Sequence, residues 1–356
     1  MESVRRGLDR VTGALGAPPV HRELERDAAH AWGVVTRDVP HEPASGPRGL
    51  WRRLRALYAG VTSKLTPARR MLFVVSLIMA GVGVIRADDN GDGEVLFLVA
   101  AIAGLVLLLM LELADRVVVR DELEIARALQ HDLLPAQPPE LDGWEFAFSY
   151  RTANTIGGDY YQLVRLADGR LAVAAGDASG HGIAAGLVMA IADAVLRVAV
   201  ARDPAPQAVA DMVDDALART SDRRAFMTLF YGLLDPADGR LEFLDAGHPF
   251  PLLRRADGGV EELGEGAPPL GIVRGVRSRT GSTRLHPGDL LVLYSDGIPE
   301  ALGPGGGSFG FDRVATVVGQ GGTALEVHDR LLRELDGFCA GHPADDDRSV
   351  VVIRRG

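Results

Sequence analysis

The stretch GGDYYQLVRLADGRLAVAAGDASGHG, residues 157–182, decides how this chain is interpreted. Two apolar runs flank the turn at 167–170, where Asp-Gly accepts the positive φ values of a tight type I′ hairpin turn. A two-residue turn pairs Asp159 with Ala178, so Asp159 and Asp177 lie at one end of the hairpin but on opposite faces of it. Convergence of the two carboxylates would then require a bulge, which the neighbouring glycines permit.

More aspartates follow or precede predicted strands. DLLVLYSDGIPE (289–300) is a buried strand that delivers Asp296 into a glycine turn, and DDDRSVVVI (345–353) places three aspartates before the last strand. Carboxylates held close together repel, so one takes up a proton or a cation binds between them. Oxygen ligands favour Mg²⁺ or Mn²⁺, and the pattern suits a two-metal centre that clamps a phosphoryl group and activates water. Simple capping of turns and helices by these aspartates is the alternative at this point.

Short apolar runs alternate with turn signals from residue 141 onward. Predicted strands cover 145–150, 159–166, 171–176, 226–234, 240–246, 289–294 and 349–354, and predicted helices cover 183–201, 206–219, 311–318 and 323–338. The helix at 183–201 is apolar enough to suggest a membrane span. Asp193 and Arg197 stand four residues apart and are expected to pair at its solvent edge, which favours a buried core helix instead.

Two uncharged runs precede this part of the chain, MLFVVSLIMAGVGVI (71–85) and VLFLVAAIAGLVLLLML (95–111). Each is slightly short of the roughly 20 residues of a spanning helix, but flanking residues extend both, and their closeness predicts a helical hairpin in the cell membrane. Arginines flank the hairpin on its outer sides and the connecting loop is acidic, so both termini are predicted to be cytoplasmic. The loop begins like a calcium-binding EF-hand, but Val99 stands where a bidentate Glu is needed, which indicates an ordinary polar turn.

Residues 1–70 carry thirteen Arg or Lys against seven Asp or Glu, whereas the whole chain has a net charge of −10. The rest of the chain is therefore strongly acidic, which argues against a nucleic-acid partner. Residues 1–47 show no signal-peptide pattern and are expected to be disordered or loosely helical. Residues 48–58 suit either a helix lying on the membrane surface or a solvated basic helix.

A helix is predicted over 112–134, ending at Pro135. A weak coiled-coil seam runs along it through Val119, Leu123, Ala126, Gln130 and Leu133. The helix joins the membrane segment to the second half of the chain. It is therefore the candidate for signal transmission or for pairing of two copies.

The order of motifs adds a resemblance. LQHDLLP, GGDYYQL, DASGHG, FMTLFYGLLD, AGHPFPLL, PLG, LHPGDLLVLYSDGIPE, FG and DDDRSVVVI follow one another over roughly residues 123–354. Together they resemble the bacterial SpoIIE-like (RsbU-type) branch of metal-dependent serine/threonine phosphatases, relatives of the eukaryotic type 2C phosphatases. The resemblance implies an α+β fold, a β-sandwich flanked by helices, with two Mn²⁺ or Mg²⁺ ions at one end.

The resulting domain prediction has four parts. Residues 1–70 form a cytoplasmic N-terminal region, 71–113 two transmembrane helices, 114–136 a linker helix and 137–356 the phosphatase domain.

The resemblance also implies a ligand set. By motif, Asp159 of GGD, Asp177 of DASGHG and Asp296 of SDG correspond to metal ligands, with the backbone carbonyl of Ala178 beside them. The last motif of the family is Asp-Asp-x-Ser/Thr, which selects Asp346 among the three consecutive aspartates. A water on the metals is the expected nucleophile.

Other candidate side chains carry less weight. His181 lies four positions after the motif aspartate, where we expect packing at the helix entry, with a proton-transfer role as the alternative. His248 in AGHP suits a structural turn or a functional role. Gln162 replaces an acid common in the family, which would alter the surroundings of the ligands. Cys339, the only cysteine, has no phosphate-cradling loop and is expected to be a core thiol. Ser179 lacks the Gly-x-Ser-x-Gly elbow of serine hydrolases.

The sequence thus predicts a membrane-anchored phosphatase that acts on phosphoserine or phosphothreonine of a regulatory protein. By resemblance, this partner would be an anti-anti-sigma factor or a similar STAS-domain protein, with membrane lipid and a second copy as further contacts. Two rivals are a pseudophosphatase that binds such a partner without hydrolysis and a membrane receptor.

Overall fold

The computed structural model describes residues 58–59, 62–63, 65–86, 93–220, 225–249, 251–264, 266–272 and 279–356. Predictions for residues 1–57 and for the acidic loop at 87–92 lie outside the described residues. The chain falls into two compact units, Met1–Val118 and Val119–Gly356, which are taken in turn.

The first unit contains the two predicted spans. Helix α4 covers Pro67–Arg86, and helix α5 covers Gly93–Leu133 without a break, so the second apolar run and the predicted linker helix form one helix. Three described helices are long and apolar enough to cross a membrane: α4, the part of α5 from Val95 onward, and α6 at Ile183–Arg202.

Helices α4 and α5 approach each other closely within the first unit. A Cβ atom on Gly104 of α5 would collide with the hydroxyl of Ser76 on α4, so the absence of a side chain allows the contact. Arg69 at the start of α4 forms ion pairs with Glu112 at 3.0 Å and Asp115 at 2.6 Å on α5. The helical hairpin is therefore held by close backbone packing and by ion pairs between the start of α4 and α5.

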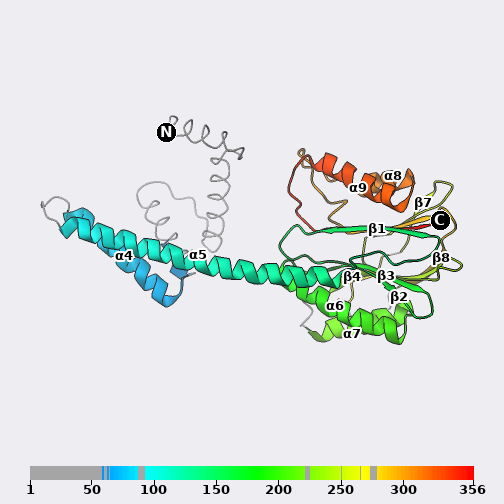
Figure 1. Ribbon diagram of the computed structural model, residues 1–356, viewed down its shortest axis with the longest axis horizontal. Coiled ribbons are helices and arrows are strands. Elements are labelled where there is room, and N and C mark those ends of the chain that lie inside the picture. The colour runs from blue at the N-terminus through cyan, green and yellow to red at the C-terminus, as the bar shows by residue number, and fades with distance from the viewer. Residues whose placement is uncertain are drawn as a thin grey trace. The chain divides into compact units, whose positions relative to one another are not determined.

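The second unit is a sandwich of two five-stranded antiparallel sheets (Figure 1). One sheet has the order β1-β10-β9-β6-β7, from Trp144–Arg151, Arg348–Arg355, Leu290–Tyr294, Leu252–Arg254 and Val260–Glu262. The other has the order β2-β3-β4-β5-β8, from Asp159–Arg165, Leu171–Ala178, Met227–Leu234, Arg240–Ala246 and Arg279–Arg284.

Helices cover the outer faces of both sheets (Figure 1). Helices α6 (Ile183–Arg202) and α7 (Pro206–Thr220) pack on the β2-to-β8 sheet, and α8 (Phe311–Gly319) and α9 (Ala324–Cys339) pack on the β1-to-β7 sheet. The predicted β-sandwich flanked by helices is therefore confirmed. Cys339 is buried in the layer of α8 and α9, as expected for a core thiol.

Helix α6 shows why apolarity alone does not identify a span. Its inner face packs into the core, and the predicted pair of Asp193 and Arg197 forms at 2.8 Å. The expected solvent edge holds for the half-exposed Arg197 but is wrong for Asp193, which is only 2% exposed. Its carboxylate also accepts hydrogen bonds from the Tyr160 hydroxyl and the Gln162 amide of β2, so this charge is satisfied in the interior.

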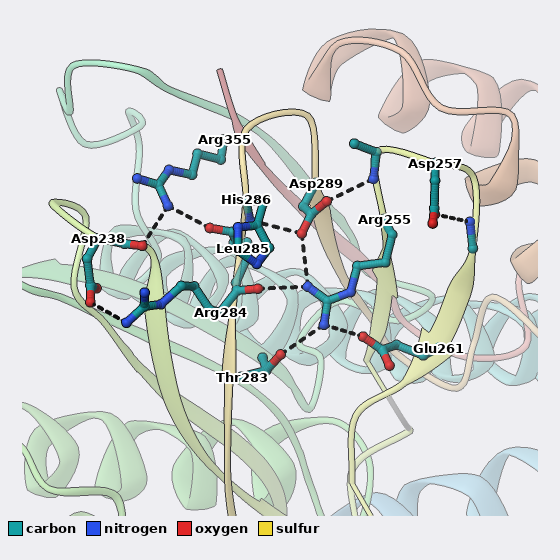
Figure 2. Close-up of polar contacts among 12 residues, drawn as sticks. Asp238, Arg255, Asp257, Glu261, Thr283, Arg284, Leu285, His286, Asp289 and Arg355 are labelled. Atoms are coloured by element: carbon teal, nitrogen blue, oxygen red, sulfur yellow. Dashed lines mark hydrogen bonds and ion pairs between the residues drawn. The ribbon is translucent and has the colours of Figure 1, made fainter.

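A polar network closes one end of the sandwich (Figure 2). The guanidinium of Arg255, after β6, donates to Asp289 Oδ2 at 2.9 Å and to Thr283 Oγ1 on β8 at 3.0 Å, so it joins the two sheets. Arg355 at the end of β10 donates to the Leu285 carbonyl at 2.6 Å. Strand β9 begins beside Asp289 and runs away from this network toward Asp296, so the predicted ligands lie at the opposite end.

Candidate metal centre

The hairpin of β2 and β3 brings its two aspartates directly opposite each other. Asp159 pairs with Asp177 in the antiparallel register, so the predicted pairing of Asp159 with Ala178 is wrong by one residue. The reason lies in the turn, which has three residues in place of two, with Gly169 at φ 91°. The Leu166 amide donates to the Arg170 carbonyl at 2.8 Å across this loop. Directly opposite residues point to the same face of a sheet, so the two carboxylates converge without a bulge at the site.

Two buried glycines let the backbone pack directly against the carboxylates of this end of the sandwich. A Cβ on Gly158 would lie 2.5 Å from Asp177 Oδ1 and 2.8 Å from the Ala178 carbonyl oxygen. A Cβ on Gly157 would collide with the carboxylate of Asp347. Any side chain at these two positions would therefore fill the space beside the predicted ligands.

The other sheet contributes the remaining carboxylates. Asp296 follows β9 and Asp346 precedes β10, at the same end of the sandwich. Asp347 has a different environment: its Oδ1 accepts from the Ala153 amide at 2.8 Å and its Oδ2 from the Gly158 amide at 2.6 Å. Asp347 thus ties the segment before β2 to β10. Asp346 is exposed, and its Oδ1 accepts from the Asp347 amide.

Asp159 is the most deeply buried member of the group. It is 1% exposed, and its Oδ2 atom has no hydrogen-bond partner among the described residues. Burial raises the pKa of this carboxyl well above its usual range; the hydroxyl of Ser295 acts in the opposite direction, and the charge of Asp177 raises the pKa further. An isolated buried carboxylate is costly unless a proton or a cation compensates it.

Asp177 and Asp296 experience the same repulsion. Burial raises the pKa of Asp177 to about 7, with further contributions from Asp296, Asp346 and Asp347. Burial, Asp346 and Glu300 likewise raise the pKa of Asp296. The four predicted ligands therefore belong to one electrostatic cluster, and within the described residues none of them pairs with an arginine.

The cluster fits a hard cation by donor type and charge. Among the described residues it offers carboxylate oxygens in excess of positive charge and a buried oxygen without a partner. In the part of the chain that the structure describes, no three His, Cys, Asp or Glu side chains yet converge as a metal site requires. The assignment of Asp159, Asp177, Ala178, Asp296 and Asp346 as ligands thus stays a prediction.

The structure places the remaining candidates apart from one another. His181 is exposed in the loop after β3, whereas His248 is buried beside Thr228. Gln162 donates to Asp193 and to the Leu133 carbonyl on the helix side of β2, so it does not face the aspartates.

Gln130 was predicted only as a seam residue, but its amide pairs with the Gly157 backbone: Nε2 donates to the carbonyl at 2.6 Å, and Oε1 accepts from the amide at 3.1 Å. Gly157 lies two residues before Asp159. No spacing rule indicates this contact, since the two residues are far apart in the sequence and one partner is backbone.

Comparison with known proteins agrees with this fold. The sequence model of the family described as stage II sporulation protein E (SpoIIE) matches residues 167–356. Protein IcfG of Synechocystis sp. is 26% identical over 264 residues, which is 66% of this chain and 42% of that protein. The phosphoserine phosphatase RsbP of Bacillus subtilis is 24% identical over 237 residues, 65% of this chain and 57% of that one.

The chain thus spans about half the length of these curated relatives. Among solved structures, the SiaA-PP2C domain of Pseudomonas aeruginosa superposes with a TM-score of 0.61 at 24% identity, covering 68% of this chain and 98% of that domain. This likeness shows a PP2C-like fold.

Proposed function

Because the chain belongs to the SpoIIE family, we propose that it is a metal-dependent protein-serine/threonine phosphatase anchored in a membrane. One observation supports this most: carboxylates from both sheets raise one another's pKa at one end of the sandwich, and among the described residues none of the predicted ligands pairs with an arginine. Such an arrangement is costly for a protein that binds no cation there. Phosphoryl transfer to water is the reaction that two clustered divalent ions support.

Asp159, Asp177, Asp296 and Asp346, with the Ala178 carbonyl, would hold two Mn²⁺ or Mg²⁺ ions. When bound, these ions would supply Lewis acidity toward the phosphoryl oxygens and make water acidic enough to attack phosphorus at neutral pH. The donor set, all oxygen, matches the preference of both ions.

The residues of the chain would hold the ligands in position. The hairpin register holds Asp159 and Asp177 on one face, and Asp347 fixes the backbone at Gly158. Gly157 and Gly158 are buried, and their lack of a side chain lets the backbone lie directly against Asp347 and Asp177. Burial of Asp159 keeps water from competing with its carboxylate as a ligand.

The substrate we propose is phosphoserine or phosphothreonine on a regulatory protein. RsbP, which is 24% identical to this chain over 237 residues, bears the name phosphoserine phosphatase. The motif order also favours an anti-anti-sigma factor or a similar STAS-domain protein as partner. Helices α4 and α5 would form the membrane anchor, with both termini cytoplasmic, and the linker part of α5 would regulate the enzyme.

The test is hydrolysis of a phosphoserine protein by the purified chain. We expect phosphate release that requires Mn²⁺ or Mg²⁺, stops with a chelator and survives alkylation of Cys339. Asp296→Asn should abolish it. Asp168→Asn should not, because Asp168 is exposed at the far tip of the hairpin and pairs with Arg170. Binding of the phosphoprotein without phosphate release would indicate a pseudophosphatase.

A further inference from the structure

A buried imidazole next to the aspartate cluster has no role in the proposed chemistry. His248 follows β5 and is 2% exposed. The turn that carries it is tightly built: Gly247 has φ 78°, and Asp245 Oδ1 accepts a hydrogen bond from the His248 amide at 3.2 Å. The backbone of this turn therefore fixes where the imidazole ring lies.

One side of the ring reaches Asp177 through a single hydroxyl. His248 Nδ1 lies 3.2 Å from Thr228 Oγ1, and the same oxygen accepts a hydrogen bond from the Asp177 amide at 3.0 Å. Thr228 is also the register partner of Asp177 between β3 and β4. The hydroxyl has one proton, which it can donate to the ring nitrogen or to the Asp177 carbonyl at 3.4 Å, so Thr228 connects the ring to both backbone polar groups of Asp177.

The other side of the ring faces the second sheet. His248 Nε2 is buried and makes no hydrogen bond among the described residues, and the backbone of Tyr294 lies beside the ring. Tyr294 is the last residue of β9, two residues before Asp296. The imidazole thus stands between the backbone segments that carry two predicted ligands from different sheets. Burial lowers the pKa of His248 to about 3, so the ring is neutral and keeps one nitrogen as an acceptor.

We infer that His248 is a positioning residue: through Thr228 it orients the Asp177 backbone, and against Tyr294 it sets the spacing to Asp296. This inference rests on the proposed function, because it assumes that both carboxylates bind a divalent cation. Partners that orient metal ligands typically contribute about 10- to 100-fold to metal affinity. The contribution of His248 should therefore appear in cation binding before it appears in substrate binding.

The experiment measures Mn²⁺ binding to the whole chain in detergent by titration calorimetry, with phosphoprotein hydrolysis as a second readout. We expect His248→Ala and Thr228→Val each to weaken Mn²⁺ binding about tenfold or more. The double variant should be little weaker than either single variant, because both changes break the same connection. Thr228→Ser restores the hydroxyl and should restore binding. At saturating Mn²⁺ the KM for the phosphoprotein should stay unchanged.

A matched control separates positioning from packing. His328→Ala removes another buried imidazole, which lies on α9 and contacts Ser149 and Asp329. This variant should lower thermal stability as His248→Ala does, yet leave Mn²⁺ affinity unchanged. The inference would be overturned if His328→Ala lost as much Mn²⁺ affinity as His248→Ala, or if His248→Ala bound Mn²⁺ normally. Additive effects in the double variant of His248 and Thr228 would also overturn it, as would absence of Mn²⁺ binding by the wild type. If the wild type binds Mn²⁺ but releases no phosphate, the proposed function fails while the positioning role is still decided by the binding data.

Discussion

Replacing Asp177 by Asn should make the metal-free protein more stable and the metal-loaded protein inactive. Burial, with the neighbouring carboxylates Asp296, Asp346 and Asp347 as smaller causes, disfavours the ionised form of Asp177 in the folded state and raises its pKa from an ordinary 3.8 to about 7. A carboxyl whose pKa is higher in the folded state than in the unfolded state stabilises the fold fully only below the unfolded-state pKa, where it is protonated in both states. As the pH rises through 7, the folded protein must ionise this carboxyl, and the stability is lost. Asn carries no charge at any of these pH values and avoids the loss.

The magnitude follows from the pKa. At about 1.4 kcal/mol per pH unit, a rise from 3.8 to about 7 sets an upper bound of about 4 kcal/mol at pH 8. Asp177 keeps partial contact with solvent, and screening reduces this to roughly 2 kcal/mol. In a unit of this size, about 2 kcal/mol corresponds to an increase of the melting temperature by roughly 4–8 °C.

The assay is thermal unfolding in chelator, followed by near-ultraviolet circular dichroism between pH 5 and pH 8. The stability gain of Asp177→Asn over wild type should grow across this range and level off above pH 7. Asp168→Asn is the control on the same hairpin, since the Arg170 side chain lowers the pKa of Asp168 and no gain should appear. A gain that does not depend on pH, or an Asn variant with full Mn²⁺-dependent activity, would refute the reasoning.

Three further predictions concern the segments around the site. A cysteine at Asp89 should react with an impermeant thiol reagent on intact cells and one at Ala136 should not; the reverse labelling would overturn the proposed orientation. Leu123→Pro should break α5 and uncouple phosphatase activity from its regulation, whereas unchanged regulation would make the linker only a tether. Gln130→Leu should leave the buried amide and carbonyl of Gly157 unpaired, at a cost of about 1–3 kcal/mol each. The variant should therefore show a lower melting temperature and, by calorimetry, a weaker Mn²⁺ affinity. Normal values for both would show that the contact is dispensable.

Local pattern was sufficient for most elements of the sandwich. The ends of the predicted strands and of the four predicted helices of the second unit agree with the structure to within one or two residues. Each of these elements has a clear apolar period or a turn at its end. Strands β6 and β7 were missed because they have only three residues each. Strand β8, RTGSTR, was missed because it is polar and largely exposed, so no burial pattern marks it.

What the pattern could not supply were contacts between distant segments. Asp193 was expected at a surface because its pairing with Arg197 is visible within the helix, whereas its bonds to Tyr160 and Gln162 depend on how β2 packs. The aspartates were found by motif, but the hydroxyl of Thr228 that holds the Asp177 backbone required the register of β3 and β4. Tertiary packing decides such contacts, and sequence periodicity does not encode them.

The three-residue loop of the β2–β3 hairpin has a consequence for which changes this protein tolerates during evolution. Surface loops usually accept the gain or loss of a residue. Here β3 is also held by β4, so deleting one residue between Leu166 and Arg170 would force β2 to slip and would turn Asp159 toward the helix layer. That deletion lies about 20 Å from the carboxylates, yet it should be as damaging as removing Asp159 itself. Homologous enzymes should therefore vary freely in the residues of this loop while preserving its length, or change the length by two.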